Sequence, residues 1–357
     1  MLRTGARVAV GLCLLLASGV GRAADGGVAP ASRVEEVTFR SGDVTLAGTL
    51  WLPSGVAPRA AVVLLHDEDS GARLSPEPYP AFLVQQGLAV LTYDRRGAGR
   101  SSGEGQPWVA GIDAWADDGL AAARLLRERT GVRDVGLMGF GQGAWVALHA
   151  AARAPDVGFL VLVSGGGGPL WKQQEHRLRN EARAKGLTGP EVVDLQEHLA
   201  TLHDARLYAP EREAKALKTL DFQLKRAKRR RWYAVSPLSR FEELPPPRLL
   251  EVQRGVWRNV LSHDSTEDLG RVRVPVLALL GELDEVTPTQ ATARALSQRN
   301  ARDAGSEAPR VTVKVLRGAD HRLVLPADAK RPGVETLAED VFPTLEGWLR
   351  ERGPAAP

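Results

Sequence analysis

Cysteine is almost absent from this chain of 357 residues, which has one Cys, and aromatic residues make up only 5% of it. Because Cys13 lies in an apolar run near the N-terminus, the rest of the chain has no disulfide framework and no thiol nucleophile. The chain also lacks an excess of charge. Its formal net charge is +4, but residues 1–23 contribute three arginines and no acid, so 4 − 3 leaves about +1 on the remaining residues. A near-neutral body gives no electrostatic argument for a nucleic-acid partner, and we expect none.

The apolar run over residues 8–16 is too short to span a bilayer as a helix, which needs about 20 apolar residues. It follows two arginines and leads to small residues around Ala23, which is the arrangement of a secretory signal peptide. We therefore expect residues 1–23 to be a cleaved signal peptide, the protein to be exported to the periplasm or beyond, and no membrane span to remain after processing. An uncleaved anchor is the alternative. Residues 24–33 are expected to be a disordered lead-in.

The body alternates short apolar segments with helical patterns. A strand hairpin is expected first, over 34–40 and 44–51. Buried strands are then expected over 60–65, 88–93, 135–138, 159–163, 274–280 and 311–316, with helices over 79–86, 112–129, 144–153, 288–299 and 336–350. This alternation predicts an α/β fold, a mostly parallel doubly wound sheet with helices on both faces. Ligands of such sheets bind beyond the carboxyl ends of the strands.

Residues 170–269 interrupt the alternation, because they show no clear strand and are rich in Glu, Lys, Arg and Leu. We expect them to form an inserted helical cap on a core made of residues 34–169 and 270–352, with Trp171, Trp232 and Trp257 as its apolar contacts to a pocket. The basic run Lys225–Arg231 is interpreted as a solvated helix face rather than as an anionic-surface patch.

A glycine-rich turn follows the strand that is expected to begin at residue 135. The residues are Gly139-Phe140-Gly141-Gln142-Gly143, and a helix follows them. The nucleophile elbow Gly-x-Ser-x-Gly occurs in this strand–turn–helix context, with flanking glycines because its backbone leaves no room for side chains. Here the central position is Gly141, which has no hydroxyl group.

Four further segments accompany this turn: Leu65-His66-Asp67-Glu68, the stretch from Asp94 to Gly103, the stretch from Leu280 to Pro288, and Leu316–His321. Together they resemble the α/β-hydrolase superfamily, specifically its exported serine-aminopeptidase-like and acyl-esterase-like members, from about residue 34 to residue 348. The resemblance implies that Asp284 is the triad acid and His321 the base. It also implies an oxyanion hole made by the backbone N–H of Gln142 and one near Asp67 or Glu68, and a structural turn at Asp94–Gly97.

Glycine has no atom with which to form an acyl-enzyme. The prediction is therefore a pseudo-hydrolase that binds a small ester, amide or acyl ligand and uses no cofactor, with Gly141→Ser expected to restore hydrolysis. One alternative is a working hydrolase of carboxylic esters or peptides that uses water or another nucleophile such as Ser164. A second is an interaction protein that acts through the basic cap. Since His66, Asp67, Asp69 and His321 lack the short spacing of a metal motif, no metal is expected there.

Overall fold

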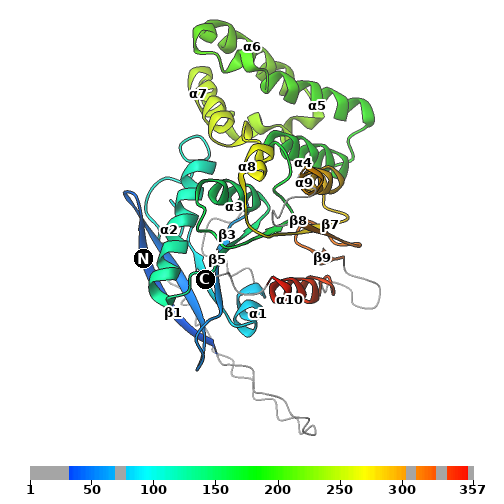
Figure 1. Ribbon diagram of the computed structural model, residues 1–357. Helices are drawn as coiled ribbons and strands as arrows, with labels where there is room; N and C mark the ends of the chain where they lie inside the picture. Colours follow the sequence, from blue (N-terminus) through cyan, green and yellow to red (C-terminus); the bar gives the residue numbers. More distant parts are fainter. Residues whose placement is uncertain (1–31, 69–77, 303–310, 327–335, 353–357) are drawn as a thin grey trace, which may run out of the picture.

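The computed structural model describes residues 32–68, 78–302, 311–326 and 336–352 (Figure 1). The predicted signal peptide and residues 24–31 of the lead-in lie outside these ranges, so export stays a prediction. Ser32 and Arg33 were assigned to the lead-in, and this is wrong, because they pair with Pro53 and Leu52 as the first residues of a strand. Among the described helices, none combines the length and the apolar character needed to cross a membrane.

Eight strands form the main sheet. They are β1 (Ser32–Ser41), β2 (Val44–Pro53), β3 (Ala60–Leu65), β4 (Leu88–Tyr93), β5 (Val135–Phe140), β6 (Leu160–Val163), β7 (Val276–Gly281) and β8 (Val311–Leu316), in the order β1-β2-β4-β3-β5-β6-β7-β8. The pairs β1–β2 and β2–β4 are antiparallel, and all other neighbours are parallel. The predicted mostly parallel α/β fold is confirmed, and each predicted strand agrees with the structure to within two residues at either end.

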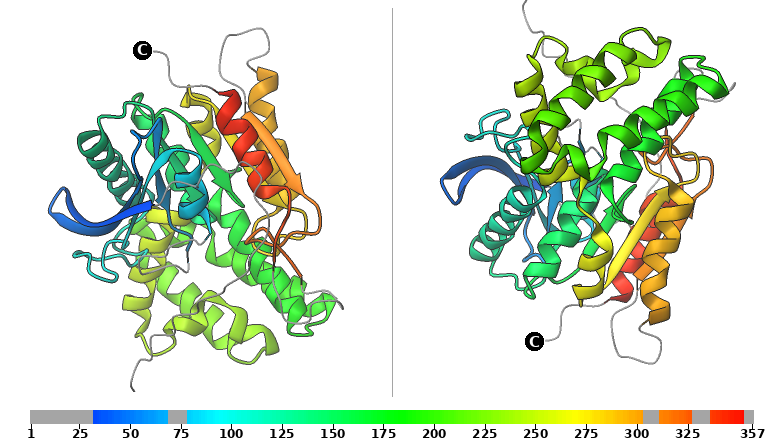
Figure 2. Two further views of the ribbon diagram at one scale, coloured as in Figure 1. Left: turned by 90° about the horizontal axis from the view of Figure 1, so that it is seen from below. Right: turned by 90° about the horizontal axis from the view of Figure 1, so that it is seen from above.

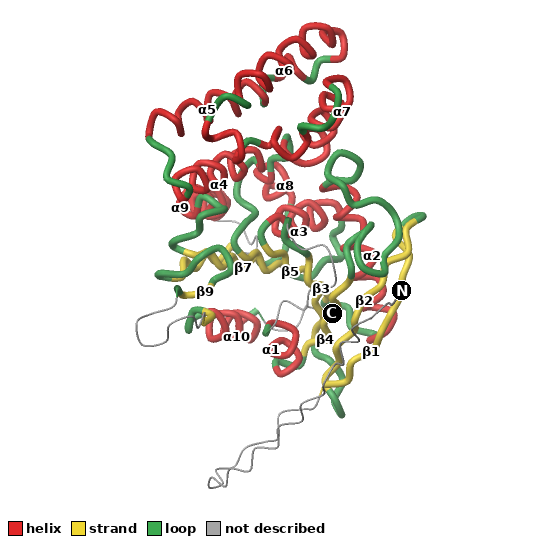
Figure 3. The backbone as a smooth tube through the Cα atoms, turned by 180° about the vertical axis from the view of Figure 1, so that it is seen from behind, coloured by secondary structure: helices red, strands yellow, loops and turns green. Residues whose placement is uncertain are grey.

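Helices cover both faces of the sheet because its central strands are apolar on both sides. On β3, Ala61, Val63 and Leu65 belong to one hydrophobic cluster and the alternate residues to the other. One face carries α2 (Ile112–Thr130), α3 (Gln142–Arg153), α8 (Ser265–Arg271) and α9 (Thr289–Arg302), and the other carries α1 (Tyr79–Gln85) and α10 (Val341–Glu351) (Figure 3). The last helix was predicted to begin at residue 336. This is wrong, because Thr336–Leu337 form β10, which pairs with β9 (Val324–Leu325).

The segment between β6 and β7 is helical. It contains α4 (Leu170–Ala184), α5 (Gly189–Leu202), α6 (Glu213–Ala227) and α7 (Pro246–Val256), followed by α8. In Figures 1 and 2, α5, α6 and α7 lie together at one end of the molecule, apart from the strands, and they share apolar clusters of their own. By contrast, Leu170, Val260 and Leu269 pack in the main core. Both ends of the insertion are therefore part of the core.

The basic run Lys225–Arg231 is largely neutralised by acidic side chains of the cap. The ion pairs are Lys225–Asp221 at 2.7 Å, Arg226–Asp194, Arg230–Asp194 at 3.2 Å, Arg231–Glu191 at 3.1 Å and Lys228–Glu242 at 4.0 Å. Among the described residues, only Arg229 of this run has no ion-pair partner. A run that is paired in this way is typical of a solvated helix face and leaves little free charge for a partner.

Candidate functional site

The glycine-rich turn lies between β5 and α3, and its backbone is as tight as an elbow requires. A Cβ on Gly139 would lie 2.1 Å from the carbonyl oxygen of Gly143, and one on Gly143 would lie 2.6 Å from the carbonyl oxygen of Leu65. Gly141 immediately precedes α3 with φ of +48° and ψ of −116°. Side chains other than hydrogen are strained in this conformation, so the turn has the geometry of a nucleophile elbow, although residue 141 has no side chain.

Asp284 and His321 come together beside this turn from the ends of β7 and β8. The His321 Nδ1 lies 2.9 Å from each carboxylate oxygen of Asp284, so it donates its proton to that group. Asp284 is held in turn by the backbone N–H groups of Val286 at 2.8 Å and Thr287 at 2.6 Å. The Asp–His pair thus has the hydrogen bonding with which an acid orients an imidazole and fixes its tautomer.

The Asp67 carboxylate fills the space where a nucleophile and an oxyanion would lie. Its Oδ2 is 3.0 Å from His321 Nε2. Its Oδ1 accepts hydrogen bonds from the backbone N–H of Gln142 at 3.0 Å and of Glu68 at 2.6 Å. The sequence predicts an oxyanion hole made by the Gln142 N–H and one near Asp67 or Glu68, so Oδ1 bonds the first donor and one of the two alternatives for the second. A Cβ on Gly141 would lie only 2.0 Å from Asp67 Oδ1, so a serine side chain fits there only if the Asp67 carboxylate moves.

Sequence reasoning missed this role of Asp67 and considered only its backbone N–H and its charge. The signal available in the sequence was a pair of changes: the elbow lost its side chain at Gly141, and the neighbouring loop carries an acid at Asp67. The structure shows that the second side chain occupies the volume left by the first.

The two carboxylates control the protonation of His321. Burial disfavours its charged form, but the hydrogen bonds to Asp284 and Asp67 outweigh burial and raise the pKa of His321 to about 10. Burial likewise opposes ionisation of Asp67, whereas the hydrogen bonds from His321, Gln142 and Glu68 lower the pKa of Asp67. At neutral pH the imidazole is therefore a cation between two anions, and its Nε2 has no lone pair with which to accept a proton.

The other candidate nucleophiles are Ser164, Ser101 and Ser102. Ser164 is fully buried, and its Oγ makes no hydrogen bond to any residue that the structure describes. The hydroxyls of Ser101 and Ser102 accept from the backbone N–H of Ala47 and Thr45 and so tie the turn after β4 to β2. Within the described ranges, no basic side chain hydrogen-bonds any of these three hydroxyls, so none of them has the partner that activates a serine for attack.

Three of the four residues that the sequence analysis considered for a metal site, without expecting one, are described by the structure. His66 Nε2 contacts the backbone oxygen of Tyr93, and burial, together with the nearby Arg95, lowers the pKa of His66 to about 4. Asp69 lies outside the described residues. His321 and Asp67 bond each other directly.

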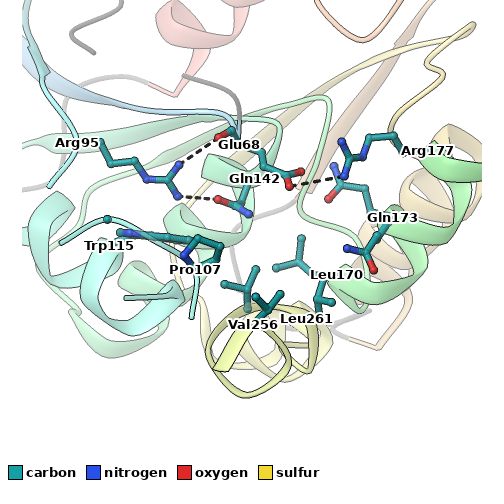
Figure 4. A pocket seen from close by; sticks show the side chains of 13 residues that line it. Glu68, Arg95, Pro107, Trp115, Gln142, Leu170, Gln173, Arg177, Val256 and Leu261 are labelled. Atoms are coloured by element: carbon teal, nitrogen blue, oxygen red, sulfur yellow. Dashed lines mark hydrogen bonds and ion pairs between the residues drawn. The ribbon is translucent and has the colours of Figure 1, made fainter. Parts of the chain in front are cut away.

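A cavity of about 140 Å³ lies between the core and the cap, beside Gln142 and Glu68 (Figure 4). Its apolar wall comes mainly from Trp115 of α2, Leu170 at the start of α4, and Val256 and Leu261 near the end of α7. Trp115 belongs to the core, and none of the three cap tryptophans predicted as pocket contacts lines this cavity. Trp232, for example, is buried inside the cap and donates to Asp194 at 2.9 Å.

Two arginines face the polar side of the cavity (Figure 4). Arg95 donates to the Gln142 side-chain oxygen at 2.7 Å, and its guanidinium lies 3.8 Å from the ring centre of Trp115. No carboxylate of the described residues forms an ion pair with it, and burial lowers the pKa of Arg95. Arg177 of α4 lies 3.7 Å from the Glu68 carboxylate. The cavity therefore has an apolar wall and a charged end, where two arginines face one carboxylate.

The turn that contains Arg95 is held by its neighbour. Arg96 makes a bidentate ion pair with Asp118 of α2, at 2.7 Å through Nε and 2.6 Å through an amino group. The Asp118 side chain is 1% exposed, so this pair lies at the buried base of the turn. The stretch Asp94–Gly97 is thus fixed beside the cavity by α2.

The family model described as serine aminopeptidase, S33 matches residues 56–327. A segment of 77 residues is 40% identical to the protein named "Putative carbamate hydrolase RutD" from Rhizobium rhizogenes, and it spans 21% of this chain and 27% of that protein. The chain thus spans about a quarter of the length of this curated relative.

Solved structures resemble the whole fold. The esterase Pf2001 of Pyrococcus furiosus has a TM-score of 0.53 at 17% identity, over 90% of this chain and 92% of that one. The 2-hydroxy-6-oxo-6-phenylhexa-2,4-dienoate hydrolase of Rhodococcus sp. strain RHA1 has a TM-score of 0.51 at 19% identity, over 90% and 100%. At such identities the likeness shows the α/β-hydrolase fold alone.

Proposed function

Because this chain belongs to the serine aminopeptidase S33 family of α/β-hydrolases, we propose that it is a pseudo-hydrolase, which keeps the fold and the binding pocket of that family without its acyl-transfer chemistry. The observation that carries the proposal is the Asp67 carboxylate, which takes the place of both the nucleophile side chain and the oxyanion. A fixed negative charge there opposes the charge that develops in acyl transfer.

Direct attack by water is the alternative that keeps an active hydrolase. It requires His321 to accept a proton from water through Nε2. That nitrogen is bonded to Asp67, and the pKa of His321 of about 10 keeps it protonated at neutral pH. A water molecule would also have to displace the Asp67 carboxylate to reach the two backbone donors. The geometry therefore disfavours this alternative.

The ligand we propose is a small acyl compound that carries a carboxylate. The apolar wall formed by Trp115, Leu170 and Val256 suits its carbon chain, whereas Arg95 and Arg177 suit its anionic group. Arg95 supports this choice most strongly, since the partners of its guanidinium among the described residues are the Gln142 amide, a backbone oxygen of Glu68 and an aromatic face. A carboxylate that replaced these neutral partners would form a charge-assisted hydrogen bond.

The first test of the proposal is covalent labelling. The wild-type chain should not react with a fluorophosphonate probe, because no activated hydroxyl exists at the elbow or at Ser164. Intact-mass spectrometry of the treated protein checks this, with the Ser164→Ala variant as the matched control. A mass shift of one probe in the wild type that disappears in Ser164→Ala would establish a serine hydrolase and reject the pseudo-hydrolase proposal.

The second test concerns the ligand's charge. Monomethyl succinate should bind at least about 10-fold more tightly than dimethyl succinate, which has nearly the same size but no carboxylate, because one charge-assisted hydrogen bond is worth about 1.5–3 kcal/mol. Isothermal titration calorimetry measures both. The Arg95→Gln variant should lose most of the preference and Arg177→Gln a part of it, whereas Arg183→Gln, an exposed arginine on the same helix as Arg177, should keep it. Equal affinities for the two compounds in the wild type would count against an anionic ligand.

A further inference from the structure

A second cluster of titratable side chains lies at the base of the cap, away from the Asp67–His321 site. His149 is on α3, Asp268 is on α8, and His263 is in the loop that precedes α8. The distances from His149 Nδ1 and from His263 Nε2 to the same oxygen, Asp268 Oδ2, are both 3.0 Å. One nitrogen or oxygen atom from each of the three residues lies within 4.8 Å of the other two.

The cluster is well shielded, since the side chains of His149, His263 and Asp268 are 16%, 17% and 5% exposed. A hydrogen-bonded network would satisfy each polar atom in such a place. Here the His263 Nε2 is buried and lies 3.0 Å from Asp268 Oδ2, but it makes no hydrogen bond of acceptable geometry to any residue that the structure describes. This nitrogen is therefore available to a further partner.

The spacing of the three atoms suits a metal ion. Zinc binds imidazole nitrogen at about 2.0–2.1 Å and carboxylate oxygen at about 2.0–2.2 Å, so two ligand atoms of a tetrahedral site lie about 3.3 Å apart. The two distances to Asp268 Oδ2, both 3.0 Å, are close to this value, and the two imidazole nitrogens lie within 4.8 Å of each other. Side-chain movements would place an ion between the three atoms.

Asp113 of α2 provides a carboxylate for the second ring nitrogen of His149, as zinc-binding histidines usually have. Its Oδ1 lies 2.7 Å from His149 Nε2, on the side of the ring opposite Asp268. In the structure His149 Nδ1 also bonds Asp268 Oδ2, at 3.0 Å. A metal ion would replace the Nδ1 proton, and the bond to Asp113 would then keep the remaining proton of the imidazole on Nε2. Metal-bound histidines commonly donate their second N–H to a carboxylate in this way.

We propose that His149 Nδ1, His263 Nε2 and Asp268 Oδ2 bind one Zn²⁺ ion, with a water molecule as the fourth ligand and Asp113 as a positioning residue for His149. Two imidazoles and one carboxylate favour zinc over Mg²⁺ or Ca²⁺, which prefer sites made of oxygen atoms alone. This proposal is independent of the pseudo-hydrolase function.

The role of the ion is to fix the cap on the core. The backbone N–H of Leu170, at the start of the cap, donates to the backbone oxygen of His263 at 3.0 Å, and Pro169 pairs with Asp264 in an isolated bridge. The two ends of the insertion are thus joined at the cluster. An ion that also bound His149 would tie this junction to α3, the helix that begins at the elbow.

The test uses the full chain after dialysis against a chelator. Titration calorimetry should show one Zn²⁺ per chain, and zinc should raise the Tm, whereas Mg²⁺ at the same concentration should do neither. His263→Gln should weaken zinc binding at least 100-fold, and Asp113→Asn should weaken it about 10–100-fold. Asp117→Asn is the matched control, because Asp117 is a neighbouring acid on α2 that pairs with Arg153 and faces no ligand atom. The Asp117→Asn variant should bind zinc with the same affinity as the wild type.

Co²⁺ provides a spectroscopic readout that does not depend on stability. The wild type should show the visible absorption of tetrahedral Co²⁺, and His263→Gln should change it. Absence of stoichiometric zinc binding in the wild type would overturn the proposal, as would wild-type affinity in folded His263→Gln. If His263→Gln fails to fold, Asp113→Asn decides the question: an unchanged affinity in that variant would remove its positioning role and would reject the site as described.

Discussion

Gly141→Ser alone should leave the protein without hydrolytic activity, and the double variant Asp67→Gly/Gly141→Ser should gain it. The reason is steric, because the new Cβ would lie 2.0 Å from Asp67 Oδ1 and the carboxylate also occupies both oxyanion donors. The single substitution, expected from the sequence to restore activity, therefore has to be combined with removal of Asp67. In the double variant the backbone N–H of Gln142 is free, and His321 no longer has a second carboxylate on its Nε2.

The measurement is hydrolysis of p-nitrophenyl acetate at neutral pH. The double variant should exceed either single variant by at least about 100-fold, since a general base and an oxyanion donor each contribute about that factor or more. Adding His321→Ala to the double variant should remove the gain. Equal activity in Gly141→Ser and in the double variant would show that Asp67 does not block the site.

Gly141→Ser should also lower the free energy of unfolding by about 2–4 kcal/mol, because a non-glycine residue is strained at this backbone conformation and the displaced Asp67 loses its hydrogen bonds. Urea denaturation of the single and double variants measures this cost. The loss should be smaller in the double variant, where no carboxylate has to move.

The second large effect is on the protonation of His321. Asp67→Asn should lower the pKa of His321 well below its value of about 10, because one of the two carboxylates that stabilise the imidazolium is removed. Titration of the ring nitrogens by NMR measures the pKa. Glu68→Gln is the matched control: it removes the neighbouring carboxylate, which makes no hydrogen bond to His321, and should leave the pKa nearly unchanged.

The same pKa makes stability depend on pH. The folded-state pKa of His321, about 10, lies above the unfolded value of 6.5, so the stabilisation is fully present below pH 6.5 and is lost as the pH rises through 10. We expect the wild type to lose on the order of 3 kcal/mol of unfolding free energy from this group between pH 7 and pH 10, and Asp67→Asn to lose less. Urea denaturation across this range tests the difference. Parallel pH profiles for the two proteins would contradict the paired-carboxylate arrangement.

The sheet could be predicted from the sequence because its strands are short apolar runs buried on both faces. The run over residues 60–65, for instance, is β3 with the predicted bounds. The elbow could be predicted because Gly139 and Gly143 are needed wherever the backbone packs so tightly. The start of the last helix could not be predicted from the sequence. Thr336–Leu337 pair with Val324–Leu325, and this pairing depends on tertiary contacts.

The role of Asp67 could not be predicted from the sequence either, because it also depends on tertiary contacts. Its side chain bonds His321, which is 254 positions away, and its direction depends on how the turn after β3 leaves the sheet. The zinc ligands that we propose are also distant in sequence, as His149 and Asp268 are separated by 119 positions. Motifs reveal sites whose ligands are close together in the chain, whereas these clusters form only when α3, α8 and the strand ends are assembled.

His321 should perform no catalysis in this protein. This is tested by comparing the rate of ester hydrolysis by the wild type with that by the His321→Ala variant. Both purified proteins are assayed for hydrolysis of p-nitrophenyl acetate at neutral pH and at equal concentration. Both should react at the same rate, close to that of buffer, because Asp67 and Asp284 hold the imidazole as a cation and residue 141 has no nucleophilic side chain. A wild-type rate 10-fold or more above that of folded His321→Ala would contradict this prediction.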